Sequence, residues 1–82
     1  MNWLFRIIET TDDKYIVEYM NDRADYELDG LFTIYLKEQR IEVHKKSLLD
    51  KNGGRAYMLY TYLLNYVREH GIDNEIHGIA IG

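Results

Sequence analysis

Apolar side chains occupy every second position or more along four segments in the first half of the chain. Alternation puts every second side chain on the same face of an extended backbone, so each segment is predicted to form a half-buried β-strand. Short polar segments separate the first strand from the second and the third from the fourth, which favours two antiparallel hairpins. The predicted strands cover residues 3–9, 15–20, 31–36 and 41–45.

The same alternation assigns the two faces of the predicted sheet. In the fourth strand, Ile41 is expected to face the core and Glu42 to face solvent. If the first two strands pair as a hairpin, Arg6 and Glu18 are expected to share the solvent face. The sheet is therefore predicted to have one apolar face that needs a covering layer.

A helix is predicted over residues 55–70, because apolar side chains recur there with helical spacing and Gly71 follows as a terminator. At about 100° per residue, one face of this helix gathers side chains that should lie on the sheet. They are Ala56, Leu59, Tyr60, Leu63 and Val67. A short apolar run at residues 76–81 favours a further strand. The pattern thus predicts an α+β fold, with an antiparallel sheet of four to five strands and one long helix on one face.

Length and composition limit the class of protein. Eighty-two residues suffice for one core, so a single domain over residues 1–82 is predicted. The chain has no cysteine, which excludes disulfides and thiolate sites and favours a cytoplasmic protein. No basic leader precedes an apolar run, and no apolar stretch reaches the roughly 18 residues of a membrane span. Neither export nor membrane insertion is expected.

The net charge of −4, from ten basic and 14 acidic residues, disfavours nucleic acid as a partner, because phosphates require a basic surface. The eight tyrosines suit surfaces that are partly apolar and partly wet. Their frequency is explained equally well by the preference of tyrosine for strands.

The apolar surface of the predicted helix is wider than one packing face requires. It covers roughly 260° of the circumference, whereas contact with one sheet needs roughly 100°. The surplus on one side consists of Met58, Tyr62 and Tyr66, and such residue types are enriched at protein interfaces. This indicates a non-enzymatic protein-interaction module that binds a second copy, as in a homodimer, or a larger protein partner. The alternative is that the tyrosine rings lie along the sheet edge with their hydroxyls in water.

A second hypothesis is a small-ligand-binding protein with an aromatic pocket between sheet and helix. The candidate lining residues are Trp3, Tyr15, Tyr35 and Tyr60, since binding pockets are commonly apolar and aromatic with few polar groups.

No catalytic, cofactor-binding or metal-binding signature is present. His44, His70 and His77 fall on a strand, at a helix end and in the tail, with no metal-ligand spacing between them. An enzyme that used His44 or His70 with the acidic loop would need these groups to converge in a cleft. We therefore predict neither an enzyme nor a bound cofactor or metal.

Two loops resemble ligand-binding motifs only in part. Residues 25–30 alternate acids before a glycine as calcium loops do, but Leu36 stands where the bidentate glutamate belongs. Residues 52–55 lead into the helix N-terminus, where free amides attract anions, yet they lack the lysine and hydroxyl residue of a phosphate loop. A solvated acidic loop and a simple hinge are the favoured interpretations.

Overall fold

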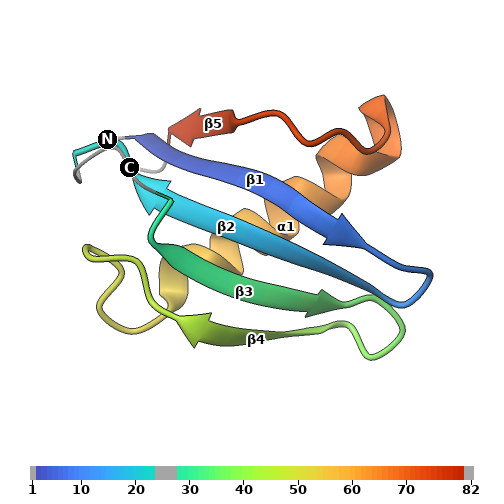
Figure 1. The fold of residues 1–82 in the computed structure, drawn as a ribbon, viewed down its shortest axis with the longest axis horizontal. Coiled ribbons are helices and arrows are strands. Elements are labelled where there is room, and N and C mark those ends of the chain that lie inside the picture. Colours follow the sequence, from blue (N-terminus) through green and yellow to red (C-terminus); the bar gives the residue numbers. More distant parts are fainter. Residues whose placement is uncertain (1, 24–27, 81–82) are drawn as a thin grey trace.

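The structure is a computed structural model that describes residues 2–23 and 28–80. Its elements are β1 (Asn2–Thr10), β2 (Lys14–Asn21), β3 (Gly30–Tyr35), β4 (Arg40–Lys45), α1 (Gly54–His70) and β5 (His77–Ala80). The strands form one antiparallel sheet in the order β4-β3-β2-β1-β5, and α1 crosses one face of it (Figure 1). The predicted α+β fold is confirmed, and each described boundary lies within one residue of the prediction.

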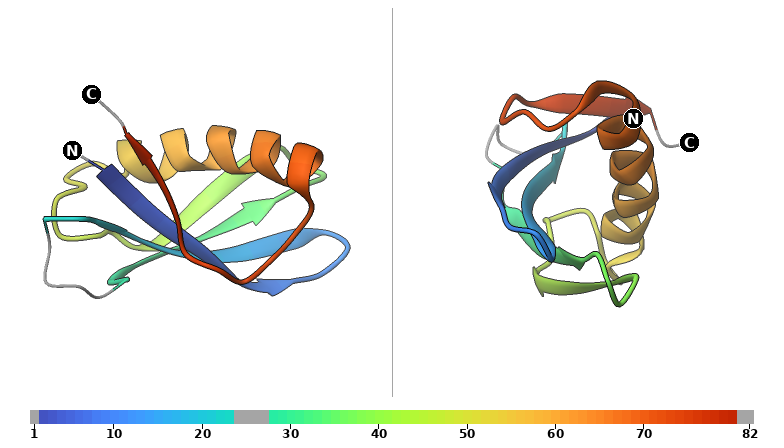
Figure 2. Two further views of the ribbon diagram at one scale, coloured as in Figure 1. Left: turned by 90° about the horizontal axis from the view of Figure 1, so that it is seen from above. Right: turned by 90° about the vertical axis from the view of Figure 1, so that its right-hand side faces the viewer.

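The core lies between α1 and the concave face of the sheet, which curves around the helix (Figure 2). The helix contributes four of the five side chains predicted for its inner face as buried residues, and the fifth, Val67, packs against them partly buried. The strands contribute the alternate residues Trp3, Phe5, Ile7, Val17, Tyr19, Phe32 and Ile34. The inward-facing side chains of the strands and of the helix therefore pack together in one apolar layer, as the sequence predicts.

The predicted assignment of faces is also confirmed. Ile41 packs against the core, whereas Glu42 is exposed. On the opposite face of the sheet, Arg6 Nη2 lies 2.8 Å from Glu18 Oε1, and the two residues are directly paired across β1 and β2.

The last strand joins the sheet beside the first. β5 runs antiparallel to β1, with Trp3 opposite Ile79 and Phe5 opposite His77. This confirms the predicted fifth strand for residues 77–80, while the end of the predicted segment, Ile81, lies outside the described residues. The pairing carries His77 from the C-terminal segment to the flank of α1.

A buried carboxylate connects the start of α1 to the centre of the sheet. Asp50 is only 2% exposed, and it accepts hydrogen bonds from the Tyr19 hydroxyl (2.7 Å) and from the backbone amides of Arg55 (3.0 Å) and Ala56 (3.1 Å). Burial, and next the hydrogen bond to Asp50, raise the pKa of Tyr19 far above its ordinary value. These three donors offset the cost of removing the carboxylate from water. Two of them are backbone amides at the N-terminus of α1, which have no acceptor within the helix.

A glycine is required beneath the Tyr19 ring. A Cβ atom at Gly30, which pairs with Tyr19 across β2 and β3, would lie 2.3 Å from Cε1 of that ring. The tyrosine therefore reaches Asp50 only because β3 begins with a residue that has no side chain.

The two loops that resemble ligand-binding motifs have structural roles where they are described. Of the acidic segment at residues 25–30, positions 25–27 lie outside the described residues. The Asp29 carboxylate accepts hydrogen bonds from the Ser47 hydroxyl (2.6 Å) and the Leu48 amide (3.0 Å). In residues 52–55, the Asn52 side chain accepts the Gly54 amide at 2.9 Å. These contacts fix the connection between β4 and α1.

Candidate functional site

The structure places the three predicted interface residues in different surroundings. Met58 is 44% exposed on the surface of α1. The half-buried Tyr62 ring meets Phe5 edge-on, with ring centroids 6.0 Å apart. The half-buried Tyr66 ring lies against His77 at 4.4 Å between centroids. Tyr62 and Tyr66 are thus partly covered by β1 and the C-terminal segment. Of the three predicted interface residues, only Met58 is exposed.

Of the seven large apolar side chains that are exposed in the described residues, four lie around the first turns of α1, and the other three, Ile8, Ile72 and Ile76, lie elsewhere. Leu49 and Met58 line one hollow of about 350 Å³, and Tyr57 lines a neighbouring hollow of about 440 Å³. Both hollows also include Asn52 and Gly54, so they adjoin. We define the helix-end surface as the four large apolar residues at this end of the molecule, which are 41–71% exposed: Leu48, Leu49, Tyr57 and Met58.

The four aromatic residues of the ligand hypothesis do not line one pocket. Trp3 and Tyr60 are buried in the core, where water and ligand have no access. Trp3 and Tyr15 lie at opposite ends of the ladder between β1 and β2. Tyr35 follows the inward-facing Ile34 and so points to the other face, where the Arg40 guanidinium covers its ring at 4.1 Å.

A separate hollow of about 580 Å³ lies on the face of the sheet that α1 does not cover. The Arg6–Glu18 ion pair forms part of its wall. The remaining lining is mainly apolar and consists of Leu4, Met20, Asp22, Leu28 and Ile76.

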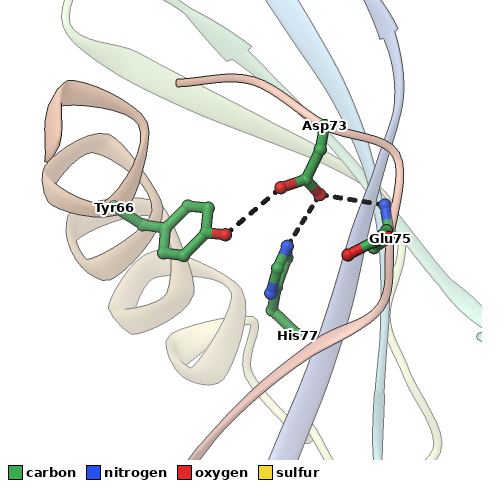
Figure 3. Close-up of polar contacts among 4 residues, drawn as sticks. All are labelled: Tyr66, Asp73, Glu75 and His77. Carbon is green, nitrogen blue, oxygen red and sulfur yellow. Dashed lines mark hydrogen bonds and ion pairs between the residues drawn. The ribbon is translucent and has the colours of Figure 1, made fainter. Parts of the chain in front are cut away.

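A polar cluster joins the end of α1 to β5 (Figure 3). The helix supplies Tyr66, the segment after it supplies Asp73 and Glu75, and the strand supplies His77. His77 Nε2 lies 2.7 Å from Asp73 Oδ1, which also accepts the Glu75 amide at 3.0 Å. The Tyr66 hydroxyl donates to Asp73 Oδ2 at 3.2 Å. The aspartate is therefore hydrogen-bonded through both oxygens.

The surroundings favour one charge state for two of these groups. The hydrogen bond from His77, followed by that from the Glu75 amide, holds the pKa of Asp73 below its usual value. Partial burial and then the contact with Asp73 raise the pKa of Tyr66. Near neutral pH the cluster thus contains an aspartate carboxylate and an uncharged phenol, with the imidazole oriented between Tyr66 and Phe5.

This arrangement can orient an imidazole and gather metal ligands. One ligand atom from each of Asp73, Glu75 and His77 lies within 4.8 Å of the others. The spacing of the three histidines from one another does not reveal this group, because its other ligands are carboxylates. The signal was the alternation of aspartate, glutamate and histidine at positions 73, 75 and 77 in an extended segment.

The other two histidines are not among these ligands, although the His70 ring lies against Tyr66 with ring centroids 4.8 Å apart. His44, which was expected to face solvent, is exposed on the edge strand β4, and its Nε2 lies 2.7 Å from Thr33 Oγ1. His70 is exposed at the end of α1, near Glu69.

Comparison of the chain with protein-family models, with curated proteins and with solved structures gave no match. In the part of the chain that the structure describes, no helix is long and apolar enough to cross a membrane.

Proposed function

We propose that the chain is a non-enzymatic protein-interaction module that binds a protein partner, either a second copy or a larger protein, through the helix-end surface. The observation that carries this proposal is the exposure of four large apolar side chains, between 41% and 71%, around one end of α1. Single exposed apolar residues are ordinary, but adjoining ones rimmed by polar residues are typical of contact surfaces.

Of the three interface residues predicted from the sequence, only Met58 belongs to the helix-end surface. Tyr62 and Tyr66 are engaged with Phe5 and the Asp73–His77 pair, so they contribute less free surface. Leu49 and Met58, in contrast, share a hollow rimmed by Lys51 and Arg55. An apolar centre with a polar rim is the usual anatomy of an interface, and methionine adapts well to differently shaped partners.

Self-association is tested by size-exclusion chromatography with light scattering, at concentrations from micromolar to millimolar. We expect a mass above the 9.8 kDa of one chain, and a return to one chain in Met58→Glu. The matched control is Asn65→Glu, which adds the same charge two turns further along α1 at an exposed position. The control should associate as the unchanged protein does.

A larger partner is tested by placing a photo-crosslinking amino acid at position 58 or position 65 in the source cell. We expect a discrete covalent adduct from position 58 and none from position 65. A protein that stays monomeric at every concentration, and that gives the same adducts from both positions, would overturn the proposal.

Small-ligand binding is a second candidate, supported by the hollow on the uncovered face of the sheet. Its volume of about 580 Å³ is in the range of ligand sites, and the apolar side chains of Leu4 and Met20 line it beside the Arg6–Glu18 ion pair. We expect anilinonaphthalene sulfonate, a probe whose fluorescence rises on apolar surfaces, to bind there through its aromatic rings. Ile76→Asp should abolish the binding, whereas Met58→Glu should not, since the latter lies outside this hollow. Equal losses in both variants would contradict this assignment.

A further inference from the structure

Three metal-ligating side chains converge where the C-terminal segment passes the end of α1 (Figure 3). They are two carboxylates and one imidazole, and their ligand atoms lie within 4.8 Å of one another. We propose that Asp73, Glu75 and His77 bind a divalent transition-metal ion of the Zn²⁺ type. This site lies apart from the helix-end surface and is independent of the proposed function.

The donor set selects the class of ion. Zn²⁺ accepts imidazole nitrogen and carboxylate oxygen at about 2.0–2.2 Å, usually with four ligands. An imidazole donor disfavours Ca²⁺ and Mg²⁺, which prefer sites made wholly of oxygen. Three protein ligands leave one position of a tetrahedron for water. The three side chains therefore form a site for an ion such as Zn²⁺, with one coordination position left to water.

The distances require only local adjustment. Ligand atoms of a tetrahedral ion with bonds of about 2.1 Å lie about 3.4 Å apart. The His77 Nε2 to Asp73 Oδ1 distance of 2.7 Å would open by less than an ångström when the ion replaces the shared proton. Glu75 is exposed, and its carboxylate makes no hydrogen bond or ion pair within residues 2–23 and 28–80. It is free to close on the ion without losing another contact.

The surroundings hold two of the ligands in place before an ion arrives. The His77 ring lies against Phe5 and Tyr66, at 5.7 and 4.4 Å between centroids. The Tyr66 hydroxyl holds the second oxygen of Asp73 at 3.2 Å. Contacts of this kind, one shell out from the ion, orient metal ligands and lower the entropic cost of binding.

The chain also contains two simpler pairs that serve as internal controls. His44 lies 3.5 Å from Glu42, and His70 lies 3.8 Å from Glu69. Each pair offers one imidazole and one carboxylate, and among the described residues neither pair has a third metal-ligating side chain close enough to complete a site. The His77 side chain is 21% exposed, against 60% for His70, so the proposed site is also the more sheltered.

The test is isothermal titration of the untagged protein with ZnCl₂ in a non-coordinating buffer. We expect one Zn²⁺ per chain, and a weakening of about tenfold or more in both His77→Ala and Glu75→Gln, because even outer partners of metal ligands contribute about 10–100-fold. Glu42→Gln and Glu69→Gln are the matched controls and should bind as the unchanged protein does. CaCl₂ and MgCl₂ should give no comparable binding.

Amide spectra of the ¹⁵N-labelled protein locate the ion and show whether each variant is folded. We expect Zn²⁺ to shift amide signals of residues 66–78 and to leave those of β3 and β4 in place. Glu75→Gln keeps the proposal testable if His77→Ala unfolds, since Glu75 is exposed and bonds Asp73 only through its backbone. Absence of Zn²⁺ binding, shifts centred on His44 or at His70 alone, or unchanged affinity in Glu75→Gln would each overturn the proposal.

Discussion

Replacing Asp50 with alanine should remove a large part of the stability of the fold. The change takes the acceptor away from the Tyr19 hydroxyl and from the amides of Arg55 and Ala56. Tyr19 and Ala56 are fully buried, so these two donors cannot turn to water without local opening. The variant tests whether the connection between α1 and β2 holds the layers together.

The magnitude follows from the donors left without a partner. Each buried donor that loses its acceptor costs about 1–3 kcal/mol, and the lost negative charge at the helix N-terminus adds about 0.3–1 kcal/mol. Relief of the desolvation of the buried carboxylate opposes these costs. We expect a net loss of about 3–4 kcal/mol, from a total of about 4–12 kcal/mol for a chain of this length.

Urea unfolding monitored by tryptophan fluorescence measures this loss. Trp3 is the only tryptophan, and it stacks on Tyr19 with ring centroids 6.0 Å apart, so its emission reports on the affected region. The control is Asp12→Ala in the exposed turn between β1 and β2, which should change the free energy of unfolding by about 0.5 kcal/mol or less. A loss below about 1 kcal/mol in Asp50→Ala would refute the reasoning, because unpaired buried donors cannot cost so little.

Three further predictions concern the same sheet. Because folding raises the pKa of Tyr19, its neutral hydroxyl stabilises the fold fully below the unfolded pKa of 10.0, and this stabilisation is lost as the pH rises above that value. Between pH 9 and 11, Tyr19→Phe should therefore lose less free energy of unfolding than the unchanged protein, as followed by circular dichroism. Gly30→Ala should lower the free energy of unfolding by about 1–3 kcal/mol in urea, because its Cβ overlaps the Tyr19 ring. Arg6→Ala should cost about 1 kcal/mol or less by the same assay, since its ion pair with Glu18 is partly exposed.

Each of these has an outcome that contradicts it. An identical loss of stability at high pH in Tyr19→Phe would assign the titration to other groups, of which the partly buried Tyr66 is the first to consider. A neutral Gly30→Ala would mean that the tyrosine ring can move aside. A loss above about 2 kcal/mol in Arg6→Ala would give the ion pair a role beyond that of a surface contact.

Local periodicity was sufficient to predict the fold because the core is built from the two simplest repeats. Ile41 and Glu42 alternate on β4, and Leu59 and Leu63 recur one helical turn apart, so covalent geometry alone assigns their sides. The fifth strand could be proposed from its apolar residues, but not its place beside β1. That place depends on pairing between segments at opposite ends of the sequence, which no local pattern records.

The candidate sites could be predicted only in part, for the same reason. Met58 was identified from its position on the helix and is exposed, whereas Tyr66 lies against a strand whose position the sequence did not give. Residue type alone groups the four aromatic residues into one pocket, whereas alternation along β3 puts Tyr35 on the face opposite Ile34. Asp50 was missed because its partner Tyr19 lies 31 residues away.

The pairing of β5 with β1 has a consequence for synthesis of the chain on the ribosome. β1 emerges first, and β2 pairs one of its edges soon afterwards, but the other edge finds its partner only when residues 77–80 have left the exit tunnel. During that interval a strand that contains Trp3, Leu4, Phe5 and two isoleucines presents an unpaired edge, the feature that invites intermolecular pairing. The nascent chain should therefore be open to intermolecular strand pairing until residues 77–80 emerge and cover this edge.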